Sequence, residues 1–509
     1  MQIDTNIINI SRKNKILYIL FFLFVSFLIL TICSNNSFLY AKFTSCDQSW
    51  YITMGNGFIH GKIPYRDMYE QKGPIVYFLY AIIVFLSGNV RNAYYGAFIV
   101  EIIILAVYMY LAYKFLNKFI NKYLSIIFAI ISGIVIANSV YLCGGGGAIE
   151  EYISPVIMWF VLIGYENIKG KPLSKKQSLL IGLYLGLIFW SKYIILLPIL
   201  AVFVVWFIYK MIKKEYKETF TSIGYMMISF FALTLFILIF FLCFGALDDL
   251  FQCYFYDNLF RYNDMISISN STLYFTYDYA PLEYIIILCL FILTAFFAVK
   301  DKNILYLCML YVFITVLSKV GKLNYYYLPL TFLTPLLIIA FLQLFNYIKE
   351  KFNFEPLKLP NKLFRSINIS LIVVLIVVSS FALCVTNINS YVSIKDENIT
   401  AQSVVAQTIR SYNLSSPTLL TFEMLDYGYY NAANIVPTEK FYARNNFSRE
   451  SYPELYESME IAVREAHTDF VLTENGRYET SPELFDEHYT LIKTYQNLQL
   501  FIKTSLLTN

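Results

Sequence analysis

Charged residues are scarce in this chain. Asp, Glu, Lys and Arg make up only 15% of its 509 residues, whereas hydrophobic residues make up 58% and the mean hydropathy is +0.57. A soluble domain of this length does not need so much apolar surface. The composition therefore excludes an ordinary soluble protein. Recurring apolar runs of about 17 to 25 residues, each long enough to cross a hydrocarbon core of about 30 Å, indicate a polytopic helical membrane protein.

Metal-binding cysteine motifs and nucleotide-binding glycine motifs are also missing. The eight cysteines show no Cys-x-x-Cys or Cys/His ligand spacing, and most fall in apolar runs, so we expect them to be core residues. Cys46 and Cys143 fall in two segments predicted to lie on the outer side, and their pairing is an alternative that the sequence does not decide. There is no Gly-rich nucleotide fingerprint and no soluble Rossmann-like domain.

The distribution of positive charge predicts the topology. If the clusters of Lys and Arg between the apolar runs are cytoplasmic, the positive-inside rule places the N-terminus inside and the C-terminus outside. About eleven membrane helices then follow. They span approximately residues 16–32, 94–116, 121–141, 153–168, 178–191, 193–210, 220–244, 282–299, 304–318, 323–346 and 366–388.

Two apolar runs differ from ordinary membrane-spanning segments. Residues 16–32 follow Arg12, Lys13 and Lys15 and resemble a signal peptide, but no small-residue cleavage site follows, which predicts a retained signal anchor. Residues 73–88 are short and begin with Gly-Pro, and counting them as a crossing would place the next lysine cluster outside. We interpret them as a re-entrant or interfacial helix.

The predicted topology divides the chain into two domains. Residues 1–389 form the membrane domain, with outer loops at 35–72, 143–152 and 245–283. Residues 390–509 have the composition of a soluble α/β domain on the extracytoplasmic side. Its predicted strands cover residues 416–422, 469–473 and 490–495, and its predicted helix covers 452–466. Because the polar loops all lie on one side of the helices, we expect a functional site there.

The first outer loop combines acids with a lysine at the membrane surface. Asp47 lies near its start, and Glu70 and Lys72 close it. Transfer of a group from a lipid phosphate to a hydroxyl or amine needs a base for the acceptor proton and positive charge for the departing phosphate. Asp47 is the candidate base, and the candidate phosphate ligands are Lys72, Lys192, Lys319 and Lys322. The alternative for Asp47 is an interfacial acid that faces water.

Four further charged residues fall within or beside apolar runs. Lys192 lies between two runs with almost no loop, which favours phosphate binding over snorkelling to the interface. Glu101 also lies within an apolar run, so a functional role and a position at the interface are again the alternatives, and it has no obvious partner in the sequence. Glu150 and Glu151 precede a predicted helix, where acids stabilise the N-terminus without any chemistry; the functional alternative is an acid that orients the acceptor or binds a metal.

Four separated motifs stand out along the chain. They are Asp47 with Tyr-Glu-Gln-Lys-Gly-Pro (69–74), Glu150 or Glu151 ahead of Pro155, Gly-x5-Lys (186–192), and Ser-Lys-Val-Gly-Lys-Leu-Asn-Tyr-Tyr (318–326). Their order, spacing and common outer placement make the set specific. With these motifs, about residues 15 to 345 resemble the GT-C glycosyltransferases of the protein O-mannosyltransferase and lipid A aminoarabinose transferase type.

The resemblance implies a GT-C fold and roles for individual residues. Asp47 activates the acceptor, and Glu70 holds a metal or the acceptor. Two departures from the family pattern are Gly73, which separates Lys72 from Pro74, and a pair of glutamates where an Asp is expected, so the choice between Glu150 and Glu151 stays open. The residues assigned to the carrier phosphate are Lys72, Lys192, Lys319, Lys322, Tyr325 and Arg261.

The implied activity is an inverting transfer of a sugar from a polyprenyl-phosphate carrier to a lipid, glycan or protein acceptor on the outer face of a bacterial cytoplasmic membrane. A divalent metal is an optional cofactor, and no nucleic acid partner is expected. A donor of this kind needs no nucleotide, which agrees with the missing nucleotide fingerprint. The rivals are a polysaccharide polymerase or ligase, which would rely on arginine-rich outer loops, and a transporter or flippase, which would show inverted repeats. The outer loops hold few arginines, and we see no repeat.

Overall fold

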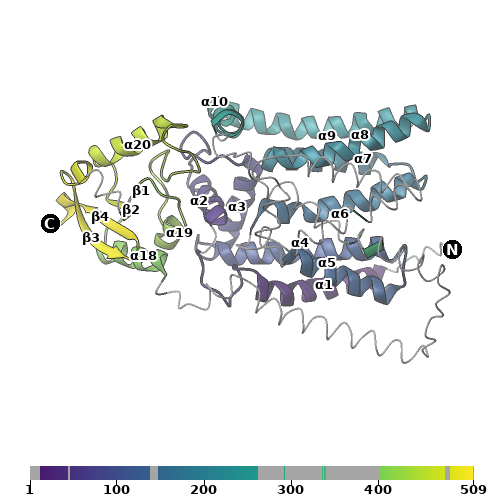
Figure 1. The fold of residues 1–509 in the computed structure, drawn as a ribbon, viewed down its shortest axis with the longest axis horizontal. Coiled ribbons are helices and arrows are strands. Elements are labelled where there is room, and N and C mark those ends of the chain that lie inside the picture. The colour runs from purple at the N-terminus through teal and green to yellow at the C-terminus, as the bar shows by residue number, and fades with distance from the viewer. Residues whose placement is uncertain are drawn as a thin grey trace. The chain divides into compact units, whose positions relative to one another are not determined.

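The computed structural model describes residues 12–43, 46–137, 147–261, 400–475 and 482–507, with isolated residues at 292, 335, 338, 339 and 398. The chain forms two compact units, shown in Figure 1. Unit 1 comprises the described residues of Met1–Ser37, Ile99–Leu233 and Ile266–Ser390. Unit 2 comprises those of Phe38–Phe98, Thr234–Met265 and Tyr391–Asn509.

Unit 1 is built from helices that run side by side (Figure 1). Its main contacts join α1 to α5, α6 to α7, and α7 to α8. The helices are α1 (Arg12–Cys33), most of α4 (Ala93–Leu116), α5 (Lys122–Ala137), α6 (Ile149–Ile168), α7 (Lys175–Lys192), the 3-10 turn η1 (Tyr193–Ile195), α8 (Leu196–Ile212) and the first part of α9 (Tyr216–Cys243).

Four helices of the described chain are long and apolar enough to cross a membrane. They span Lys15–Cys33, Ala93–Leu116, Lys175–Ile195 and Tyr216–Cys243. The first seven predicted helices are confirmed as helices, with boundaries that differ by up to four residues in the described parts. The largest difference is at α1, α6 and α9, which each begin four residues earlier than predicted.

Helices α7 and α9 of unit 1 approach each other through a glycine. A Cβ atom at Gly182 would lie 1.9 Å from the carbonyl oxygen of Met226 and 2.4 Å from Oγ of Ser229. One turn later, a Cβ at Gly186 would lie 3.1 Å from a methyl group of Leu233. This small-x-x-x-small spacing lets the two backbones come into contact, as is common between membrane helices.

The first outer loop and the short apolar run that follows it contribute two packed helices to unit 2. They are α2 (Cys46–Ile59) and α3 (Pro74–Ser87). Pro74 occupies the first turn of α3, where its missing N–H costs nothing, and Gly88 ends the helix with φ of +75°. The short helix predicted for residues 73–88 is thus confirmed, while its placement in a membrane stays a prediction. The same unit contains the end of α9, α10 (Leu247–Leu250) and the π-helix η2 (Phe251–Arg261).

The C-terminal part of unit 2 is an α/β fold, as predicted. Its four-stranded sheet has the order β1-β2-β4-β3, in which β1 and β2 are parallel and the other neighbours are antiparallel. The strands are β1 (Leu419–Thr421), β2 (Phe470–Glu474), β3 (Tyr489–Tyr495) and β4 (Leu498–Lys503). The helices are α18 (Ala401–Ser411), α19 (Tyr429–Ala433) and α20 (Pro453–Arg464), with short 3-10 turns η5 (Pro482–Leu484) and η6 (Thr504–Leu506).

Several predictions fall on parts of the chain that the structure does not describe. The predicted helices at 282–299, 304–318, 323–346 and 366–388 lie there, apart from isolated residues, and so does most of the outer loop at 245–283 after Arg261. The total of eleven helices, the sidedness of the termini and the division at residue 389 stay predictions.

Candidate functional site

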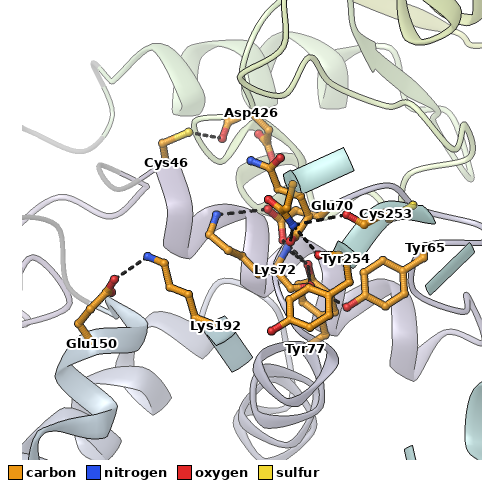
Figure 2. A network of polar contacts seen from close by, with 12 residues as sticks. Cys46, Tyr65, Glu70, Lys72, Tyr77, Glu150, Lys192, Cys253, Tyr254 and Asp426 are labelled. Atoms are coloured by element: carbon orange, nitrogen blue, oxygen red, sulfur yellow. Dashed lines mark hydrogen bonds and ion pairs between the residues drawn. The ribbon is translucent and has the colours of Figure 1, made fainter. Parts of the chain in front are cut away.

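Glu70 and Lys72, at the end of the first outer loop, are held together in unit 2 (Figure 2). The Glu70 carboxylate is buried and accepts hydrogen bonds from the backbone N–H of Lys72, at 2.9 Å, and from the hydroxyl of Tyr77. The Lys72 ammonium lies 3.5 Å from the other carboxylate oxygen. Tyr65 fixes the same segment by donating to the Lys72 carbonyl at 2.6 Å. The loop therefore presents Lys72 as a positioned, partly buried cation.

The surroundings of Glu70 do not fit a divalent metal. Such ions need several oxygen ligands around one point, commonly two or more carboxylates. Within the described residues, no three His, Cys, Asp or Glu side chains converge in a way that could hold one. Glu70 instead bonds to a tyrosine hydroxyl, an amide and an ammonium group. We derive no chemistry through a metal here, and the predicted role of Glu70 as a ligand stays untested.

Asp47 lies in the first turn of α2 and is exposed. An exposed carboxylate at this position is accessible to an acceptor, and the helix N-terminus stabilises its charge. Its neighbour Cys46 is different: burial raises the pKa of the Cys46 thiol to about 12, and the Asp47 carboxylate adds to the rise. Cys46 is a free thiol and donates to the carbonyl oxygen of Asp426 at 3.6 Å. Its alternative partner Cys143 lies outside the described residues.

Arg261, at the end of η2, is engaged by two acids of unit 2. Its guanidinium lies 3.6 Å from Asp257 and 3.4 Å from Glu454, and it stacks over the ring of Tyr452 with 3.9 Å to the centroid. Asp257 is fully buried and also accepts from Tyr69 at 2.6 Å. Burial raises the pKa of the Asp257 carboxyl. The predicted phosphate ligand Arg261 thus has a structural role in this unit, and a phosphate would have to compete with these acids.

Glu150 and Lys192 form a buried ion pair in unit 1. The Lys192 ammonium lies 2.5 Å from the Glu150 carboxylate, and the two residues are only 9% and 5% exposed (Figure 2). Glu150 is in the first turn of α6 and Lys192 is the last residue of α7, so each charge lies at the helix end whose dipole favours it. The structure therefore brings together two residues that the sequence singled out separately. Glu151 is also buried, at 1% exposure.

The partners of Glu101 were not evident from sequence. Glu101 is fully buried in unit 1 and accepts from Ser34 Oγ at 2.6 Å and from Asn36 Nδ2 at 2.5 Å. These donors follow α1, more than sixty residues earlier. Hydrogen bonds of this kind offset the cost of burying a carboxylate. The remaining candidates Lys319, Lys322 and Tyr325 lie outside the described residues.

Sequence reasoning missed a polar cluster between α2 and the C-terminal segment of unit 2. Asn431 donates to the Ser49 carbonyl at 2.9 Å and to the Tyr94 hydroxyl at 3.1 Å. Asp426 lies beside it and is fully buried. Burial raises the pKa of the Asp426 carboxyl to about 6. The only signal in the sequence is the turn composition of Asp-Tyr-Gly-Tyr (426–429), which does not reveal a partner in α2.

Comparison with known proteins identifies the fold but no sequence family. The sequence matches no family model and no curated protein. The structure resembles ArnT from Cupriavidus metallidurans in the apo state, with a TM-score of 0.61, 11% identity, and coverage of 96% of this chain and 98% of that chain. The same protein bound to undecaprenyl phosphate gives a TM-score of 0.60 at 12% identity with the same coverage. The apo oligosaccharyltransferase from Archaeoglobus fulgidus gives 0.50 at 13% identity, covering 96% of this chain and 75% of that chain.

This chain has the GT-C fold. The expected resemblance is confirmed at that level, because the ArnT match extends over nearly the full length of both chains. At 11 to 13% identity the similarity concerns the backbone arrangement and assigns no role to a residue.

Proposed function

We propose that this protein is a membrane glycosyltransferase that transfers a sugar from a polyprenyl-phosphate carrier to a lipid, glycan or protein acceptor on the outer face of the cytoplasmic membrane. The observation that carries the proposal is the full-length agreement with ArnT, one structure of which holds undecaprenyl phosphate. Four apolar helices in the described chain agree with a multi-pass protein that meets a lipid-linked donor.

The proposed reaction is a single inverting displacement. An acceptor hydroxyl or amine attacks the anomeric carbon while the bond between that carbon and the phosphate oxygen breaks. The electron pair of this bond leaves with the polyprenyl phosphate, and the acceptor proton passes to a base. Asp47 suits the base because its carboxylate is exposed and unblocked at a helix N-terminus.

Lysines are proposed to stabilise the charge that develops on the departing phosphate. In unit 2, Lys72 is held beside Glu70, and in unit 1, Lys192 is held beside Glu150. Each carboxylate holds its lysine in place before the donor binds. A positioned cation needs little reorganisation when negative charge appears, which is the condition for electrostatic catalysis. Glu150 and Glu151 would orient the acceptor or support this cation.

The test is transfer of radiolabelled sugar from a panel of polyprenyl-phosphate monosaccharides by membranes that contain the protein. We expect wild type to transfer from at least one donor and Asp47→Asn to lose about a hundredfold or more in rate, the size of a general-base contribution. The matched control is Glu487→Gln, which removes an exposed carboxylate from the same unit.

Two results would overturn the proposal at different levels. Equal transfer by wild type and Asp47→Asn, at equal protein levels, would remove Asp47 from the mechanism but leave the enzyme class intact. No transfer from any donor would remove the class. Formation of long repeating products would instead support the polymerase or ligase alternative, and movement of labelled lipid without transfer would support a flippase.

A further inference from the structure

A cavity opens between the first turns of α7 and α9 in unit 1, and its lining contains none of the residues assigned to transfer. Its volume is about 430 Å³. Two lysines, one glutamate and four hydroxyl-bearing side chains line it together with Leu173, and most of the surface that these residues present to the cavity is apolar. The lining residues are Leu173, Lys175, Ser178, Lys217, Glu218, Thr221, Ser222 and Tyr225.

The cavity follows from the packing of the two helices. α7 and α9 are in direct backbone contact at Gly182 and Met226. Ser178 lies one turn before Gly182 in α7, and Ser222 lies one turn before Met226 in α9. Both have short side chains and line the cavity. These short side chains leave space between the two helices, and the cavity occupies it on the N-terminal side of the contact.

The charge in this cavity favours an anion. Lys175 and Lys217 both line it, and Lys175 lies over the ring of Tyr225 with 5.1 Å to the centroid, which holds its ammonium group near the other lining residues. Glu218 also lines it; its carboxylate lies 3.7 Å from Lys210, which pairs more closely with Glu215, so within the lining two lysines face one acid. The N-termini of both helices add partial positive charge on the same side.

A buried hydroxyl points to a ligand rather than to a general surface charge. Ser178 is only 1% exposed, and within the described chain its Oγ has no hydrogen-bond partner. A buried polar atom normally has a partner, and an unsatisfied one costs free energy. A phosphate oxygen in the cavity would satisfy it.

The location selects a lipid as the source of the phosphate. The cavity lies where two helices that are long and apolar enough to span a membrane begin. From Thr221, the exposed face of α9 continues through Ile228 and Phe231, seven and ten residues later, with 62% and 54% exposure. Residues at this spacing share one helix face, so acyl chains can follow them from the cavity into the membrane.

We propose that this cavity binds the phosphate headgroup of an anionic glycerophospholipid. Basic pockets between membrane helices are suited to such headgroups. Lys175 and Lys217 pair with the phosphate, Ser178 donates to one of its oxygens, and the exposed face of α9 contacts the acyl chains. The site shares no residue with the proposed transfer chemistry, and its occupancy is measurable whether or not that proposal holds.

The experiment titrates the purified full-length protein in detergent with dioctanoyl phosphatidylglycerol and measures the bound fraction by native mass spectrometry. We expect Lys175→Gln/Lys217→Gln to weaken binding about thirtyfold, since each lysine near an anionic headgroup contributes about fivefold. Ser178→Ala should weaken it about tenfold by removing one hydrogen bond to a charged group. The control Lys176→Gln/Lys213→Gln removes the same charge from two exposed lysines outside the cavity.

Equal weakening by the two double variants would overturn the proposal, because it would show attraction to the whole basic segment. Equal binding of dioctanoyl phosphatidylcholine would overturn it as well. Binding of glycerol 3-phosphate as tight as that of the lipid would assign the site to a soluble phosphate and overturn the lipid assignment. Unchanged thermal unfolding of the variants establishes that any loss is not a loss of folding.

Discussion

Thr53 in α2 donates a hydrogen bond to the buried carboxylate of Asp426, 373 residues later in the chain, with 3.2 Å between Oγ1 and Oδ2. The other carboxylate oxygen accepts from the backbone N–H groups of Gly428 and Tyr429, at 2.8 Å each. Gly428 has φ of +96°, and a Cβ there would lie 2.9 Å from Cβ of Phe43. The turn around Asp426 is therefore packed against the segment that leads into α2, the helix that carries Asp47.

Asp426→Asn should change how stability depends on pH. The pKa of Asp426 is raised from an ordinary value of 3.8 to about 6, so the folded protein binds this proton more tightly than the unfolded chain. The contribution of this group to the free energy of unfolding is fully present below pH 3.8. It is lost as the pH rises from 3.8 to about 6, by on the order of 3 kcal/mol. Asn keeps an acceptor for the two N–H groups and does not titrate.

We therefore expect the variant to gain stability relative to wild type as pH rises from 4 to 7. Thermal unfolding of the purified protein, followed by intrinsic fluorescence, gives the measurement. Glu487→Gln, at an exposed acid, should follow the wild-type profile. A constant difference between Asp426→Asn and wild type across this range would contradict the prediction.

Removing one member of the Glu150–Lys192 pair should destabilise the protein more than removing both. Lys192→Met leaves a buried carboxylate without its cation, which costs about 3 to 5 kcal/mol. Glu150→Gln in the same chain should recover most of this loss. The measurement is a double-mutant cycle: the unfolding temperatures of wild type, Lys192→Met, Glu150→Gln and the double variant are compared.

The same set of variants separates a structural from a functional role. If Lys192 binds the carrier phosphate, the double variant recovers stability but not sugar transfer. Recovery of both would show that Lys192 acts only as the partner of Glu150.

Gly182→Ala should separate α7 from α9. The added methyl group would lie 1.9 Å from a backbone oxygen, so the helices must shift, at a cost of about 1 to 3 kcal/mol. Gly164→Ala in α6 is the matched control, since its Cβ would meet no described atom within 4 Å. There the substitution should stabilise by about 0.5 to 1 kcal/mol. We expect Gly182→Ala to lower the unfolding temperature and Gly164→Ala to raise it. Equal changes in unfolding temperature for the two variants would rule out the close contact.

Glu70→Gln should leave the metal response of transfer unchanged. The Glu70 oxygens already bond to Tyr77 and to Lys72, and no three His, Cys, Asp or Glu side chains of the described residues converge to hold a metal. We expect the ratio of rates with and without EDTA to be the same for the variant and wild type. A response present in wild type and lost in the variant would identify Glu70 as a metal ligand.

Membrane helices and their approximate limits could be predicted because their signal is local. A long apolar run bounded by lysines is sufficient, and α4 was placed to within one residue. The strand β4 was missed, although the Gln-Asn pair before it is a hairpin turn in which Gln496 has φ of +54°. That signal is weak, because Gln is an unusual residue for a left-handed turn position.

The sequence singled out individual charged residues as candidates, but it did not predict which of them form ion pairs. Lys192 stood out as a charge between two apolar runs and Glu150 as an acid ahead of a helix, yet 42 residues separate them and only the packing of α6 against α7 brings them together. Asp426 did not stand out at all, since an acid in a Gly- and Tyr-containing turn is typical of a solvent-exposed loop. Its burial depends on α2, which no local pattern near residue 426 reveals.

The composition of unit 2 has a consequence for synthesis of the protein. Its described parts come from Phe38–Phe98, Thr234–Met265 and Tyr391–Asn509, so α2 and α3 emerge long before the turn that packs against them. At about 5 to 20 residues per second, translation of the intervening chain takes on the order of half a minute. During that interval the polar face of α2 and the aromatic residues around it have no partner from the C-terminal segment. The helix that carries Asp47 therefore reaches its final environment only after the turn around Asp426 has been made.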